Sequence, residues 1–507
     1  MAGTSQNQPV TRSGRVESVV LHIVGLALII GGLGMVVSAA IDISDSATQA
    51  LEILACGVGS LAIGFLFNRV SVVPERIDTS SVFAAVAFSW VALTLVSAVL
   101  YVVTGTFDSF ADGVFESVSG FTTTGATVLD PIEGTAHGVL FWRSTTQWLG
   151  GMGVIVLVVA VLPVLGVGGM DLLAAEAPGP SDERLTPRVR FTAQRLWAIY
   201  VGFTLAIIGA YVIGGMSVFD AVNHAFTTIS TGGFSTYDDS FAHFGSTYLE
   251  WAAVVSMFAA GASFPMYYRV LRGRSIRLFR SMEAGTYLGI VLVGTAIILI
   301  VNRVEVGVGH GAVRETLFTV VSISSTTGYG LIDFTQWAVA PQTLLLIMMA
   351  MGAMAGSTAG GFKVIRVLGI MRFARRELLR ALHPELVRPV RVGRSILEER
   401  VVNRIMGFFV MFLGTILVAT VTIAAFEVDL VTALSAAVSS IGNVGPALGE
   451  LGSGNYTNVD TGADMAAAAT MLLGRLEIYP VLLAVAAFPR WRARWDAQNR
   501  VRRSARR

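Results

Sequence analysis

Four short segments rich in serine, threonine and glycine each lie between two long apolar runs. They are DGVFESVSGFTTTGAT, FDAVNHAFTTISTGGFST, RETLFTVVSISSTTGYG and DLVTALSAAVSSIGNVGPALG, and an acidic residue precedes a glycine by 12 or 13 positions in each: Asp112, Asp220, Glu315 and Asp429. Dehydrated cations take oxygen ligands, which backbone carbonyls can supply where glycine lets a loop adopt unusual dihedral angles. The repeated pattern predicts a cation site built from four loops.

Each segment is expected to form a re-entrant unit. About ten mildly apolar residues would form a short helix whose positive end lies near the acid. The Ser/Thr-Gly part would then turn back without crossing the membrane. Non-helical backbone at this depth is tolerated only when it is buried in protein or lines a wet cavity. The negative ends of the four short helices would favour a cation at the centre.

The composition indicates an integral membrane protein. Apolar residues make up 54% of the 507 residues and charged residues only 14%, against about 25% charged in a soluble domain. Many apolar runs are long enough to cross a bilayer. We expect spans at residues 19–41, 48–67, 82–104, 139–165, 193–214, 247–270, 284–302, 341–370, 403–426 and 464–488.

The spans and inserts predict an all-α membrane protein with four same-oriented span–loop–span repeats, in pseudo-fourfold arrangement around one pore, and two extra N-terminal spans. Repeats of one orientation are related by an axis along the membrane normal. The expected divisions are an N-terminus at 1–18, a two-span hairpin at 19–76, repeats at 77–190, 191–280 and 281–400, and a fourth repeat with the C-terminus at 401–507.

Arginine placement predicts the orientation. Most arginines follow the even-numbered spans, and basic loops stay on the cytoplasmic side. Both termini of this multi-pass protein of the cell membrane are therefore expected to be cytoplasmic. The arginine clusters could contact anionic lipids, and they could also dock a cytosolic partner, with Arg372, Arg375, Arg376 and Arg380 as the main candidates.

The eighth expected span contains a glycine-rich stretch that predicts a break in the helix. Each glycine costs about 1 kcal/mol relative to alanine inside a helix, although small residues can also serve close helix packing. Lys363, the single lysine of the chain, follows this stretch and could anchor a loop or extend toward the membrane surface. Arg475 falls near the middle of the last span. A charge there is costly unless it faces a cavity or a partner, so we expect it to face the cavity below the loops.

Several stretches resemble the Trk/Ktr/HKT superfamily of potassium transporters, and the two extra spans resemble its TrkH-type membrane subunits. The matching stretches include SGFTTTGAT, RSTTQWLGGMGVIVL, TTISTGGFST, SISSTTGYG, GAMAGSTAGGFKVIRV, SSIGNVGPALG and MLLGRLEIYP. The resemblance covers nearly the whole chain. It implies potassium uptake through a single-file selectivity filter, a gate below the filter, and a homodimer whose cytosolic face binds a ring of RCK/TrkA-type subunits. Any nucleotide would bind to that partner.

The resemblance also implies site residues. The filter glycines map onto Gly125, Gly232, Gly328 and Gly442, and a glycine at the first position favours potassium over sodium. The K+ binding residues are expected to be Thr123, Thr124, Gly125, Thr231, Gly232, Thr327, Gly328, Ile441, Gly442 and Asn443. The gate residues are expected to be Gly352, Gly356, Ser357, Thr358, Ala359, Gly360, Gly361, Lys363 and Arg475.

Other functions have less support in the sequence. A membrane-embedded enzyme would need a catalytic set at membrane depth, and no HExxH, GxSxG or paired intramembrane aspartates occur. A receptor or scaffold would leave the four loops unexplained. A passive channel and a symporter coupled to H+ or Na+ could use the same filter, so both stay open. We expect no nucleic-acid partner.

Overall fold

The computed structural model describes residues 16–43, 45–73, 79–160, 186–273, 281–302, 309–385, 387–393, 395–452, 454–479 and 481–482. The described residues are almost entirely helical, as expected. They also form two small sheets. Strands β1 (Val16–Glu17) and β2 (Ser71–Val72) pair in parallel, and β3 (Val390–Val392) and β4 (Ser395–Leu397) pair antiparallel.

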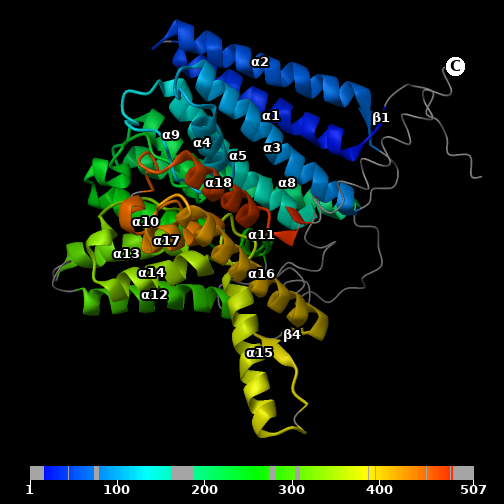
Figure 1. The fold of residues 1–507 in the computed structure, drawn as a ribbon, viewed down its shortest axis with the longest axis vertical. Helices are drawn as coiled ribbons and strands as arrows, with labels where there is room; N and C mark the ends of the chain where they lie inside the picture. Colours follow the sequence, from blue (N-terminus) through cyan, green and yellow to red (C-terminus); the bar gives the residue numbers. More distant parts are fainter. Residues whose placement is uncertain are drawn as a thin grey trace, which may run out of the picture.

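Helices α1 (Val19–Asp42) and α2 (Ala47–Val70) form a hairpin at one edge of the bundle (Figure 1). Glycine allows the two helices to approach closely, since a Cβ added at Gly64 would lie 2.7 Å from the carbonyl oxygen of Gly25. Small residues commonly serve this purpose between membrane helices. The hairpin packs against α3 and α5, outside the four repeats.

The four repeats follow in chain order, each with a short helix between two longer segments. The first comprises α3 (Thr79–Val103), α4 (Phe110–Phe121) and α5 (His137–Ala160), and the second α8 (Thr186–Ile213), α9 (Val218–Ile229), α10 (Thr247–Ala260) and α11 (Phe264–Leu271). The third comprises α12 (Met282–Val301), α13 (His310–Ser324), α14 (Val339–Met351) and α15 (Val364–Leu382), and the fourth α16 (Glu399–Ala424), α17 (Leu430–Gly442) and α18 (Thr461–Arg475). Short 3-10 helices η1 (Ser240–Phe244), η3 (Phe334–Gln336) and η4 (Gly449–Leu451) lie in the connections.

Three expected spans differ from continuous helices. The span at 247–270 bends by 91° between α10 and α11, where Gly261 is the C-cap of α10 and Pro265 lies in the first turn of α11. The span at 341–370 is interrupted between α14 and α15. Helix α18 ends at Arg475, so this arginine lies at the end of a helix and not, as we expected, near the middle of a continuous span. Residues 483–488 of the expected last span lie outside the described part. Within that part, six helices are long and apolar enough to cross a membrane, or seven with the bent pair.

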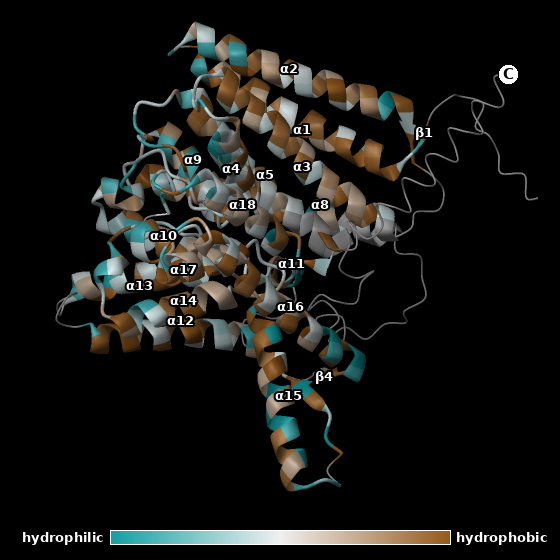
Figure 2. Ribbon diagram, viewed as in Figure 1, coloured by the Kyte–Doolittle hydropathy of each residue, from teal (hydrophilic) through white to brown (hydrophobic). Residues whose placement is uncertain are grey.

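Helix α15 differs from the other long helices in its direction. It projects beyond α12 and α14, with the β3–β4 hairpin beside it (Figure 1). Its hydropathy alternates along its length, whereas α12 is predominantly apolar (Figure 2). The helix packs against β3 and α16, so the projection remains attached to the membrane-spanning part.

Candidate functional site

The four short helices position the candidate site. At 12 to 15 residues, each is too short to cross a bilayer. Asp112 and Asp220 lie in the first turns of α4 and α9, as expected. Asp429 caps α17 and accepts hydrogen bonds from the amides of Val431 and Thr432. Hydrogen bonding by Thr432 lowers the pKa of Asp429. Glu315 is the exception, because it lies beyond the first turn of α13.

After each short helix the chain follows the same path. The first residue with a left-handed backbone is Thr123 (φ 55°), Thr231 (φ 57°), Thr326 (φ 60°) or Asn443 (φ 52°). The second, two positions later, is Gly125 (φ 86°), Gly233 (φ 79°), Gly328 (φ 81°) or Gly445 (φ 100°). The side chains of the first set, Thr123, Thr231, Thr326 and Asn443, are fully buried. The four loops are thus equivalent in conformation although their sequences differ.

The shared conformation changes which glycines of the second and fourth loops correspond to Gly125. The positions that correspond to Gly125 are Gly233 and Gly445, in place of the expected Gly232 and Gly442. Gly442 is the last residue of α17, three positions before the loop glycine. Backbone hydrogen bonds agree with the new register, because the amides of Thr124, Gly232, Thr327 and Val444 bond to the carbonyls of Ser119, Thr227, Ser322 and Ser439.

The loops form a closed ring, because each glycine lies against the next loop. A Cβ at Gly125 would lie 2.1 Å from the carbonyl oxygen of Gly232, one at Gly233 2.0 Å from that of Thr327, one at Gly328 2.0 Å from that of Val444, and one at Gly445 2.6 Å from that of Thr124. Real Cβ atoms do not approach oxygen this closely. Glycine is therefore required at all four positions by the contact as well as by the positive φ.

A buried ion pair supports the first two loops. Arg143 Nε on α5 lies 2.7 Å from Glu116 Oε1 on α4, and both side chains are at most 1% exposed. Glu116 also accepts hydrogen bonds from the first loop at Thr127 Oγ1 and Val128 N. Arg143 donates to the carbonyl oxygen of Ser235 in the second loop. The pair therefore connects two adjacent parts of the ring.

Gln147, one helical turn after Arg143, binds the second loop directly. Its Nε2 donates to the Gly232 carbonyl oxygen at 2.8 Å, and its Oε1 accepts from the Phe234 amide at 3.1 Å. The Arg143 guanidinium also lies 4.2 Å from the centre of the Phe234 ring. We did not anticipate Glu116, Arg143 or Gln147 from the sequence. The stretch RSTTQWLGG contains two of them, and polar residues inside a predicted span were the available signal.

The glycine-rich segment between α14 and α15 is a folded loop against the ring, so the predicted helix break is observed. Its Gly360 amide donates to Thr326 Oγ1 at 2.8 Å, and a Cβ at Gly360 would lie 2.1 Å from the Gly442 carbonyl oxygen. Thr358 Oγ1 donates to the carbonyl oxygen of Ile229 at 2.9 Å. The loop thus contacts the ends of α9 and α17 and the third loop of the ring.

Charged residues hold this loop from several sides. Lys363 Nζ donates to the Ala359 carbonyl, so the lysine closes the loop on itself. The Ala355 amide donates to Glu283 Oε1 of α12 at 2.7 Å. The remaining expected residues, Gly352, Gly356, Ser357 and Gly361, lie in the same loop, with Gly352 and Gly361 packed against each other. Glu283 was not anticipated from the sequence.

Arg475 contacts the loop directly. Its Nη1 donates to the Thr358 carbonyl oxygen at 2.8 Å and its Nη2 to that of Gly150 at 3.4 Å. Only 4% of the residue is exposed, and no carboxylate among the described residues forms an ion pair with it. Glu477 instead pairs with Arg366 of α15 at 2.5 Å. The arrangement brings an unneutralised cation beneath a ring of four re-entrant loops in a multi-span membrane protein.

Comparison with known proteins identifies the family. The family model TrkH, described as a cation transport protein, matches residues 60–491. The Trk system potassium uptake protein TrkH of Halomonas elongata is 37% identical over 474 residues, covering 92% of this chain and 97% of that protein. The Escherichia coli K12 protein of the same name is 36% identical over 408 residues, covering 79% and 84%. This chain belongs to the TrkH family of cation transport proteins.

The fold agrees with this assignment. The crystal structure of the potassium transporter TrkH from Vibrio parahaemolyticus matches with a TM-score of 0.84 at 32% sequence identity, covering 92% of this chain and 97% of that one. The predicted family and fold class are confirmed. The prediction of a transport protein, in preference to a membrane-embedded enzyme, is confirmed as well.

Proposed function

We propose that this protein takes up potassium across the cell membrane through a selectivity filter formed by residues 123–125, 231–233, 326–328 and 443–445. The closed ring of four equivalent loops is the observation that carries the proposal. Four loops of one conformation would direct their backbone oxygens toward a common axis, where rings of carbonyls can replace the hydration shell of a cation. The C-terminal ends of the four short helices point their partial negative charge toward the same region.

The proposed gate is the loop at 352–361 together with Arg475. The loop contacts the third loop of the ring and the ends of two short helices, so it would obstruct an ion that leaves the filter. Arg475 adds an electrostatic barrier, because charges interact more strongly in a partly desolvated space than in bulk water. The hydrogen bond from Arg475 to Thr358 makes the two obstacles a single unit.

The family assignment supports further parts of the proposal. The protein would act as a homodimer with both termini in the cytoplasm, regulated by a cytosolic RCK/TrkA-type subunit that binds the nucleotide. The curated relatives are named as uptake proteins of the Trk system, and the arginine-rich loops support the orientation.

Ion flux into proteoliposomes of the purified protein tests the proposal. Potassium, sodium and proton gradients should be varied independently. We expect potassium influx that follows its own electrochemical gradient and exceeds sodium influx. Influx that requires a proton or sodium gradient would establish the symporter alternative with the same filter. Equal potassium and sodium fluxes would contradict the filter assignment.

A further inference from the structure

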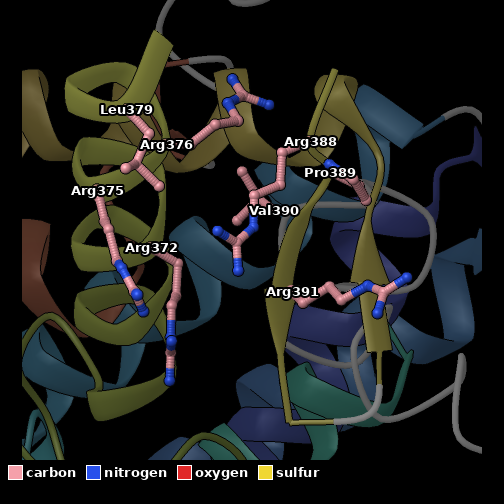
Figure 3. Close-up of a pocket in the computed structure, with 8 residues that line it drawn as sticks. All are labelled: Arg372, Arg375, Arg376, Leu379, Arg388, Pro389, Val390 and Arg391. Carbon is pink, nitrogen blue, oxygen red and sulfur yellow. The ribbon is translucent and has the colours of Figure 1, made fainter. Parts of the chain in front are cut away.

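A basic cavity of about 280 Å³ lies outside the transport pathway, between α15 and β3 (Figure 3). Its lining residues are Arg372, Arg375, Arg376, Leu379, Arg388, Pro389, Val390 and Arg391. Figure 3 shows the side chains of Arg372, Arg375 and Arg388 in the space between α15 and β3, whereas those of Arg376 and Arg391 extend away from it. Arginine is the side chain best suited to bind phosphate, because its planar donors match the phosphate oxygens.

Most of this positive charge has no acidic partner. Arg376 pairs with Glu377 at 2.9 Å and with Glu399. Arg372 makes one weak contact, 3.9 Å from the sulfur of Met282. Among the described residues, no ion pair involves Arg375, Arg388 or Arg391. Like charges repel when they are gathered without counterions, so the cavity favours an anionic occupant.

The surroundings of the cavity indicate the depth at which it lies. Met282, which contacts Arg372, is the first residue of α12, and Glu399, which contacts Arg376, is the first residue of α16. Both helices are long and apolar enough to span a membrane. The cavity is therefore level with the ends of two spans, where lipid headgroups lie.

An apolar stripe runs beside the arginines on α15. Met371, Leu378 and Leu382 are 64%, 66% and 67% exposed. Their spacing of seven and four positions places them on one face of the helix, which borders the face that carries Arg372 and Arg375. A helix with exposed apolar residues next to arginines is typical of elements that lie in the membrane interface.

We propose that this cavity binds the phosphate group of an anionic phospholipid, with the lipid chains along the exposed stripe of α15. The arginines would supply the contacts to the phosphate oxygens, and the position at the ends of α12 and α16 would bring the headgroup within reach. This site is separate from the ion pathway, so it goes beyond the proposed uptake function.

The test uses the full-length chain in detergent and native mass spectrometry of bound lipid. Phosphatidylglycerol, phosphatidylcholine and inorganic phosphate serve as the three probes. The test variant carries Arg372→Gln, Arg375→Gln and Arg388→Gln, which leaves the paired Arg376 intact. The control variant removes three exposed arginines elsewhere, by Arg69→Gln, Arg195→Gln and Arg272→Gln. Both variants lose the same net charge.

We expect the test variant to bind phosphatidylglycerol roughly 100-fold more weakly, because each arginine near an anionic surface contributes about fivefold. The control variant should bind it like the unmodified protein, and phosphatidylcholine should bind weakly to all three. Inorganic phosphate that binds at millimolar concentration and displaces the lipid would assign the phosphate site to a soluble ligand instead.

Equal phosphatidylglycerol binding by the test and control variants would overturn the proposal. So would a test variant that keeps lipid binding but loses self-association or binding of an acidic cytosolic protein, because the arginines would then form a protein interface. Size-exclusion chromatography of each variant distinguishes these outcomes from misfolding. None of these readouts depends on ion flux, so they remain informative if the potassium assignment fails.

Discussion

Replacing Arg143 with glutamine should lower potassium selectivity by releasing two loops of the ring. The substitution removes the ion pair with Glu116 at 2.7 Å and the hydrogen bond to Ser235 O at 3.3 Å. It leaves the Glu116 carboxylate buried, where removal of one partner of an ion pair costs about 3–5 kcal/mol. The hydrogen bonds to Glu116 from the first loop remain, so we expect the loss of folding stability to lie near the lower end of this range, at about 3 kcal/mol.

Part of this loss should appear as selectivity. If the free-energy difference by which the filter prefers potassium over sodium falls by about 1.4 kcal/mol, the ratio of potassium to sodium flux falls about tenfold. We therefore expect Arg143→Gln to lower the ratio of potassium to sodium flux in proteoliposomes by about tenfold. Denaturant or thermal unfolding of the same preparation would measure the stability loss independently.

A second buried ion pair provides a matched control. Arg366 of α15 lies 2.5 Å from Glu477 and is 4% exposed, and its side chain donates to Phe362 and Glu477, neither of which belongs to the ring. Arg366→Gln should destabilise the protein while leaving the potassium-to-sodium ratio unchanged. The double variant Glu116→Gln/Arg143→Gln should recover stability by removing the unpaired carboxylate. A folded Arg143→Gln protein with unmodified selectivity would refute the supporting role of this pair.

Further predictions concern the ring and the gate. Gly125→Ala should abolish or strongly reduce potassium selectivity, because its Cβ would meet a carbonyl oxygen at 2.1 Å. Gly134 also has a positive φ but has open space around it, so Gly134→Ala should leave potassium selectivity unchanged. The ratio of potassium to sodium flux in proteoliposomes checks both variants. Arg475→Ala and deletion of residues 355–359 should each raise unregulated potassium flux, while Arg475→Lys should keep flux low at low potassium because it retains the charge. Flux against potassium concentration, without a partner subunit, separates these cases. Glu283→Ala should raise the same flux by freeing the gate loop, and unmodified rates at normal expression would count against this role.

The sequence was sufficient to predict the four short helices, their connection to four loops and the break in the eighth span. These features have local causes. Apolar runs of membrane length, first-turn acids and clustered glycines each act within a few residues of their own position. The register within a loop was harder to predict. Two glycines occur in the second loop and two in the fourth, and the resemblance to the family pointed to the first of each two, Gly232 and Gly442, whereas the backbone places the positive φ at Gly233 and Gly445.

A spacing rule in the sequence identifies the loop glycines that have a positive φ. Each loop contains threonine or asparagine two positions before the glycine that lies at positive φ: Thr123 and Gly125, Thr231 and Gly233, Thr326 and Gly328, Asn443 and Gly445. The pair Glu116–Arg143 could not be found in this way, because its partners are 27 positions apart and meet only when α4 packs on α5. The contact of Arg475 with Thr358 spans 117 positions and depends equally on tertiary packing.

The proposed gate loop and the ring are in direct contact, and we infer that neither can move alone. Thr326 has the left-handed backbone that starts the third loop of the ring, and its Oγ1 accepts the hydrogen bond from Gly360 in the gate loop. A Cβ at the same glycine would meet the Gly442 carbonyl oxygen at the end of α17 and, at 3.0 Å, the Cβ of Asn443, which starts the fourth loop of the ring. Displacement of the gate loop would therefore remove a hydrogen bond from one quarter of the ring and packing from another. Opening the gate would also alter the environment of the filter, so conduction and selectivity should change together in gate-loop variants.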